Sequence, residues 1–191
     1  MKGRMYILML LSVLALGLNS CGGGGGSGGV GTISSTSGGT FTAATILLDS
    51  DVAVWTGTPC GATSTYTVLP DNVNVTFTAF SAPAGSTGNT PEQVVIDSVT
   101  ITYTPATAGT PGLGYLSQAV GQQVALGSSI SIPVRVATQA QKQSTPLSAL
   151  LCTTTIYSYR AVMEFNCHYL VSGNTFQGST WMNLNFADFA N

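Results

Sequence analysis

Few residues of this chain have side chains suited to catalysis or metal binding. Of its 191 residues, one is a histidine and four are cysteines, and charged residues make up 6% of the composition. The histidine, His168, lies in an alternating stretch and is expected on its polar side. No Gly-x-Ser-x-Gly or comparable nucleophile setting accompanies it. We therefore expect a solvated surface imidazole, no catalytic residues and no enzymatic activity.

Three cysteines outside the N-terminal region raise the question of disulfide pairing. An exported chain can hold disulfides, and an odd number leaves one thiol over. Cys60 lies in a Thr-Pro-Cys-Gly loop pattern, and Cys152 precedes a long alternating segment. Cys167 shares its expected inward side with Met163 and Phe165, where a thiol behaves as a small hydrophobe. Three pairings are open; we favour Cys60–Cys152, with Cys167 buried and free.

Two groups of side chains invite a metal-binding interpretation. Cys167 and His168 are neighbours on an expected strand, so they point to opposite faces and do not converge on one zinc ion. Asp49 and Asp51 flank a serine. Calcium takes about six to eight oxygen ligands, and no Asp-x-Asp-x-Asp-Gly loop is present. We therefore expect no metal site and no cofactor.

Three aromatic side chains are candidates for ligand contact. Phe80 and Trp181 fall where alternation predicts polar residues, and Trp55 precedes a glycine-containing loop. Exposed aromatic rings suit sugar stacking or protein contact. The alternative is that a neighbouring strand or loop covers each ring. A cluster of all three on one exposed face would favour a binding role.

The N-terminus carries an export pattern. Lys2 and Arg4 precede an apolar run over residues 5–18, and the sequence continues as Leu18-Asn19-Ser20-Cys21. The run is shorter than the roughly 20 residues that span a bilayer. A basic start, a short apolar segment and a small residue before the cut site are typical of a secretory signal, which is removed.

Leu18 and Ser20 in these positions before Cys21 resemble the lipobox of bacterial lipoproteins, although Asn19 departs from it. The resemblance implies a signal peptide over residues 1–20 and lipidation of Cys21. An ordinary signal peptide with a chance thiol is the alternative. Acylation by more than one chain would give stable membrane attachment. Gly22, where inner-membrane lipoproteins usually carry Asp, implies the outer membrane or the cell surface.

Residues 21–40 are rich in Gly, Ser and Thr, which predicts a flexible linker. A phosphate-binding loop is the alternative, but no strand precedes the glycines and no Gly-Lys-Ser/Thr follows. Loss of the signal would leave three basic residues against seven acidic ones. Nucleic-acid binding therefore has no electrostatic basis.

Residues 41–191 alternate between apolar and polar side chains, as in Val73–Ala79. Pro133 on a polar side suggests an edge or bulged position. With turn signals between the segments, the pattern predicts one all-β domain, an antiparallel β-sandwich of about 7 to 9 strands. Residues 145–151 are expected to form at most one helical turn. Alternation is clear over 99–103, 130–136, 159–169 and 180–186, and weaker over 45–48, 52–55, 66–68 and 122–126.

Several strand and turn patterns resemble small bacterial lipoproteins with an Ig-like domain. The resemblance implies an Ig-like sandwich in the cell envelope, and it supplies no catalytic residues. Cys167 and His168 depart from it, because a glycine and an acidic residue are more usual there. The matching stretches are 97–103, a strand ending in 137–142, 145–147, 161–165 and 185–189.

Together these features predict an envelope lipoprotein whose sandwich makes structural or adhesive contacts. Its expected partners are the membrane, through lipidated Cys21, and an unidentified protein or glycan. The alternative function is a carbohydrate-binding module that uses Trp55, Phe80 or Trp181.

Overall fold

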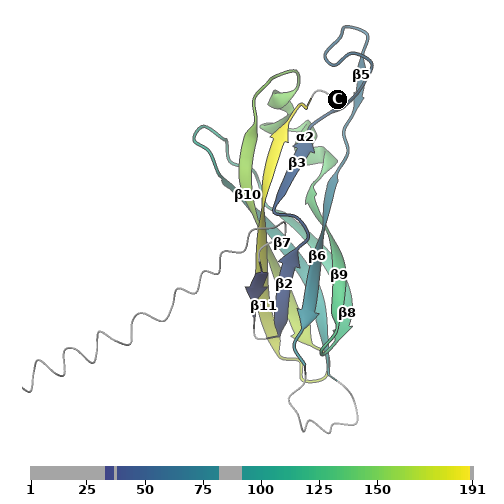
Figure 1. Ribbon diagram of the computed structural model, residues 1–191, viewed down its shortest axis with the longest axis vertical. Coiled ribbons are helices and arrows are strands. Elements are labelled where there is room, and N and C mark those ends of the chain that lie inside the picture. Colours follow the sequence, from purple (N-terminus) through teal and green to yellow (C-terminus); the bar gives the residue numbers. More distant parts are fainter. Residues whose placement is uncertain (1–32, 37, 82–91, 190–191) are drawn as a thin grey trace, which may run out of the picture.

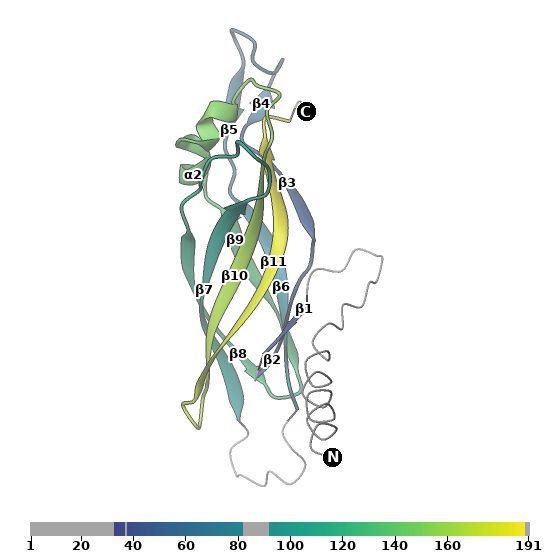
Figure 2. The ribbon, with the colours of Figure 1, turned by 90° about the vertical axis from the view of Figure 1, so that its left-hand side faces the viewer.

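The computed structural model describes residues 33–36, 38–81 and 92–189. They form an elongated β-sandwich with a short hairpin at one end (Figures 1 and 2). One sheet has the strand order β1 (Ile33–Ser35), β2 (Gly39–Ala43), β6 (Asp71–Ala79), β9 (Ser129–Ala137). The other has the order β3 (Leu47–Asp51), β11 (Thr175–Ala187), β10 (Tyr157–Tyr169), β7 (Gln93–Pro105), β8 (Leu116–Ala125). The hairpin pairs β4 (Val54–Thr56) with β5 (Thr65–Thr67). The all-β sandwich prediction is confirmed.

The core lies between the two main sheets and follows the alternation in the sequence. In β6 and β10 every second side chain is buried. Phe41 of β2 stacks on Phe165 of β10, with ring centroids 4.3 Å apart. A Cβ at Gly178 would lie 2.5 Å from the Phe41 ring, so only glycine leaves room for that ring. Each buried phenylalanine contributes about 1.5–3 kcal/mol, which makes this stack a main contact between the sheets.

Strand β3 is the one place where the described sheets depart from antiparallel pairing. It runs parallel to β11, with Leu48 opposite Leu184. Between β2 and β3 the chain exchanges β6 for β11 as its neighbouring strand and keeps its direction. Ala44 N still donates to Asn74 O of β6, whereas Asn183 N of β11 donates to Ile46 O. The segment therefore leaves the first sheet and joins the second in the same direction.

The four-stranded sheet begins inside the predicted linker. Strand β1 and the start of β2 fall within residues 21–40. Gly38 and Gly39 are buried, and a Cβ on either would clash with the ring of Phe176 or Phe77. These two glycines allow the chain to pack closely against the rings. A glycine-rich composition is the same for a packed segment and for a flexible one, so it did not reveal this role. Residues 21–32 and 37 of that linker, Cys21 among them, together with the signal peptide, lie outside the described residues.

Two short helical segments connect β9 to β10. Helix α2 (Gln139–Gln143) replaces the strand that was expected to continue to Lys142. Thr138 caps it, and the Gln141 side chain reciprocates in a capping box. The 3-10 turn η1 (Leu147–Leu150) lies within the turn predicted for residues 145–151. Among the described residues, no helix has the length and apolar character needed to cross a membrane.

Candidate functional site

The chemically distinctive region lies at the hairpin end of the sandwich. A disulfide joins Cys60, in the loop between β4 and β5, to Cys152, just after η1. The two Cα atoms are 5.7 Å apart, and 92 residues separate the cysteines along the chain. This is the pairing favoured from the sequence, and both half-cystines are exposed.

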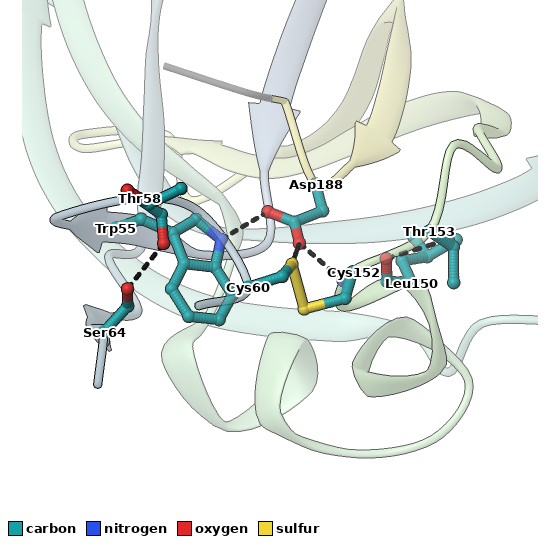
Figure 3. Close-up of a disulfide and its surroundings, with 8 residues drawn as sticks. All are labelled: Trp55, Thr58, Cys60, Ser64, Leu150, Cys152, Thr153 and Asp188. Carbon is teal, nitrogen blue, oxygen red and sulfur yellow. Dashed lines mark hydrogen bonds between the residues drawn. A yellow bond between two sulfur atoms is a disulfide. The ribbon is translucent and has the colours of Figure 1, made fainter. Parts of the chain in front are cut away.

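The carboxylate of Asp188 lies against this disulfide, directly after β11 (Figure 3). Its Oδ1 accepts a hydrogen bond of 2.8 Å from the Trp55 indole. Its Oδ2 accepts one of 2.6 Å from Cys152 N and lies 3.8 Å from Cys60 Sγ. Asp188 therefore connects the end of the last strand to both cysteine-bearing loops.

Each loop holds its cysteine in a left-handed backbone conformation, with φ of 60° at Cys60 and 58° at Cys152. This region costs about 1–2 kcal/mol per non-glycine residue. Local hydrogen bonds maintain it, since Gly61 N donates to Thr58 O and Thr153 N donates to Leu150 O. The two sulfur atoms are thus positioned by their loops as well as by their mutual bond.

Cys167 is the free cysteine among the described residues, and it is buried in the core. Burial, with a smaller contribution from the nearby Asp97 charge, raises the pKa of its thiol to about 12. Because the thiolate is the reactive form, this thiol is chemically inert in the folded protein.

We expect the native chain carrying Cys21→Ala to show no thiol reaction with Ellman's reagent at pH 8, and one reactive thiol after unfolding. The free energy of unfolding should also fall as the pH rises from the ordinary thiol range toward 12, since only the unfolded chain then releases the proton. A stoichiometric reaction in the native state would contradict the buried position of Cys167.

His168 does not stand alone on the surface as expected. Its Nδ1 lies 2.9 Å from Asp97 Oδ2, and both side chains are partly exposed. The imidazole therefore has a carboxylate partner from the neighbouring strand β7. Asp97 was missed as this partner because a bulge in β7 shifts the register next to it.

A second polar cluster is buried beneath the hairpin end. Lys142 Nζ lies 2.9 Å from Asp71 Oδ2 and donates a 2.8 Å hydrogen bond to Asp51 O. Ser50 Oγ donates to the same Asp71 oxygen. The Lys142 side chain is 1% exposed, so a substrate has no access to this group. Its geometry is that of a structural connection between the sheets.

The two aspartates considered for calcium make separate contacts. Asp49 Oδ1 accepts a hydrogen bond from Asn185 Nδ2, whereas Asp51 Oδ1 accepts bonds from Ala53 N and Phe189 N. Burial raises the pKa of the Asp51 carboxyl, and those two backbone donors oppose the shift. The two carboxylates therefore connect β3 to β11 and to Phe189, which follows it.

The structure does not bring the three candidate aromatics together. Trp55 belongs to the hairpin and packs against Tyr66, with ring centroids 5.0 Å apart. Phe80 follows β6 and is 44% exposed. Trp181 lies in β11 of the other sheet, under the guanidinium of Arg160 at 4.0 Å. The three rings therefore do not cluster on one exposed face, which is the arrangement that would favour a shared binding role.

A shallow cavity of about 180 Å³ lies between the edge strands β8 and β9. Small-molecule sites usually occupy about 300–1,000 Å³, so this one is small. It contains no titratable side chain, since its lining residues are Gln118, Ala119, Val120, Gln122, Ile132 and Pro133. Pro133 does lie on an edge strand, as its polar-side position suggested.

Comparison with protein-family models, curated proteins and solved structures gave no match. Within the part of the chain that the structure describes, the cluster of Cys60, Cys152, Asp188 and Trp55 combines exposure, ligand atoms and a fixed arrangement.

Proposed function

We propose that this chain is a lipid-anchored protein of the bacterial cell envelope, whose β-sandwich makes non-catalytic structural or adhesive contacts. The observation that carries the proposal is the Cys60–Cys152 disulfide. Disulfides persist in oxidising compartments outside the cytoplasm, which is where the signal pattern ending at Cys21 would send the chain. The outer membrane is the proposed destination.

The non-catalytic part of the proposal rests on the contacts of the polar groups. The buried Ser50 and Lys142 are both bonded to Asp71, and solvent does not reach them. No buried side-chain nitrogen or oxygen of the described residues lacks a hydrogen-bond partner. These buried polar groups are therefore committed to the fold.

The anchor is tested by replacing Cys21 with alanine. We expect the wild-type chain to be recovered from the detergent-soluble membrane fraction and to incorporate labelled palmitate. The Cys21→Ala variant should lose the label and leave that fraction, because stable attachment requires the acyl chains.

Ser20→Ala is a matched control, since it keeps a small residue before the cysteine and should retain the label. A Cys21→Ala variant that stays membrane-bound through the same N-terminal segment would overturn the lipid anchor. Separation of the outer and inner membranes on a density gradient then tests the destination.

A further inference from the structure

The disulfide end of the sandwich contains the ligand set of a metal site that reduction would expose. The two sulfur atoms and one carboxylate oxygen of Cys60, Cys152 and Asp188 all lie within 4.8 Å of one another. In the disulfide form the sulfur atoms carry no negative charge and are bonded to each other. After reduction, the same atoms become two thiols beside a carboxylate.

We propose that the reduced chain binds one zinc ion through Cys60, Cys152 and Asp188, with water as the fourth ligand. This site goes beyond the contact function proposed above and does not depend on it. Zinc accepts mixed sulfur and oxygen ligands in a tetrahedral arrangement. The exposed position of both cysteines leaves one side of the ion open to solvent.

The distances agree with such a tetrahedron. Zinc bonds of about 2.3 Å to sulfur and about 2.0–2.2 Å to oxygen separate the sulfur and oxygen ligands by about 3.5 Å. Cys60 Sγ already lies 3.8 Å from Asp188 Oδ2. Two sulfur ligands would lie about 3.8 Å apart on the same zinc–sulfur bond length. Breaking the disulfide opens the sulfur–sulfur edge, since unbonded sulfur atoms move apart to van der Waals contact, and the ligand atoms already lie within 4.8 Å of one another.

The surroundings of the three ligands favour the same arrangement. The Trp55 indole donates to Asp188 Oδ1, and Cys152 N donates to Oδ2, so two hydrogen bonds hold the carboxylate with Oδ2 beside the sulfur atoms. Hydrogen bonds of this kind orient metal ligands and tune their basicity. Local hydrogen bonds hold each cysteine loop independently of the disulfide, so reduction should leave both sulfur atoms near their present positions.

A dithiol is the reductant for the Cys60–Cys152 disulfide. Two thiol–disulfide exchanges transfer two electrons and two protons to the Cys60–Cys152 bond, and the dithiol becomes a disulfide. Zinc then displaces the two thiol protons and binds the thiolates. In the reverse direction, a disulfide oxidant accepts the two electrons by thiol–disulfide exchange and becomes a dithiol, while the Cys60–Cys152 bond re-forms and the ion is released. The same two loops are therefore joined either by a covalent bond or by a metal ion, according to the redox state.

The test uses Co²⁺ as an optical probe on the full-length chain carrying Cys21→Ala and Cys167→Ala. In this background Cys60 and Cys152 are the remaining cysteines. We expect thiolate-to-cobalt charge-transfer absorption with one ion bound per reduced chain, and displacement of cobalt by Zn²⁺. The oxidised form of the same protein should give no such band. Zinc should raise the unfolding temperature of the reduced form and leave that of the oxidised form unchanged.

Two variants separate the ligands from the fold. Cys60→Ser should abolish the charge-transfer band at equal cobalt concentration. Loss of an outer-shell partner already costs about 10- to 100-fold in metal affinity, so Asp188→Asn should weaken binding by at least that factor. Circular dichroism checks that both variants are folded. The proposal is overturned if the reduced protein gives no band, if the oxidised protein binds equally, or if folded Asp188→Asn binds as tightly as its parent.

Discussion

Replacing Cys60 and Cys152 together with alanine should lower the free energy of unfolding by about 4 kcal/mol. The bond closes a loop across 92 residues, and the entropy that a disulfide removes from the unfolded chain grows with loop length. For a chain of this size, the loss corresponds to a fall of roughly 10 °C in the unfolding temperature. Urea titration followed by far-ultraviolet circular dichroism measures it.

Reduction of the wild-type protein supplies the matched control. With a chelator present to keep metal away, a reducing agent should shift the wild-type urea midpoint to that of the double alanine variant. The variant itself should not respond to the reductant. If the double variant unfolds at the oxidised wild-type midpoint, the loops at this end are held by their hydrogen bonds alone.

The sandwich is predictable from the sequence because its strands are buried on one face only. In β6 and β10 the buried and accessible positions alternate with the period of the pleat, and this alternation is visible in the residue types. The favoured cysteine pairing followed from the same pattern, since alternation places Cys167 in the core and leaves the two loop cysteines.

The structural features that the sequence did not predict depend mostly on contacts between distant segments. Gly38 and Gly39 have a linker-like composition, and only the positions of Phe176 and Phe77 show that they are packed. The partner of Lys142 in helix α2 is Asp71 in strand β6, which no local pattern indicates. Helix α2 did have a local signal, because Thr138 followed by Gln141 is a capping box.

The candidate site depends both on residue types visible in the sequence and on contacts between distant segments. Its cysteines stand out by type, but Asp188 and Trp55 become part of it only where the chain end meets the hairpin, 133 residues apart in sequence. Cys60, Cys152 and Asp188 are therefore too far apart in the sequence to form a short motif.

Lys142→Met should lower the free energy of unfolding by about 3–5 kcal/mol, the usual cost of removing one partner of a buried ion pair. Methionine keeps most of the apolar stem, so the change isolates the loss of the ammonium group. Without it, the Asp71 carboxylate retains the Ser50 hydroxyl but no opposite charge, and Asp51 O loses its donor.

A double-mutant cycle with Asp71→Asn identifies the ion pair as the cause. If the charges act on each other, the combined variant should be destabilised by less than the sum of the two single changes, with a coupling of about 1–3 kcal/mol. Lys142→Arg is a less useful control, because the larger guanidinium does not fit a site that is 1% exposed. Simple additivity would mean that Lys142 acts through packing.

The position of this pair explains why its loss should affect the whole fold. Lys142 extends from α2 to Asp71 at the start of β6 in one sheet and to Asp51 at the end of β3 in the other. Asp51 in turn accepts a hydrogen bond from Phe189 N, next to Asp188. The buried ion pair and the exposed disulfide therefore belong to one polar connection across this end of the sandwich. We accordingly expect Lys142→Met to loosen the cysteine loops as well, measured as faster reduction of the Cys60–Cys152 disulfide by a dithiol than in the wild type.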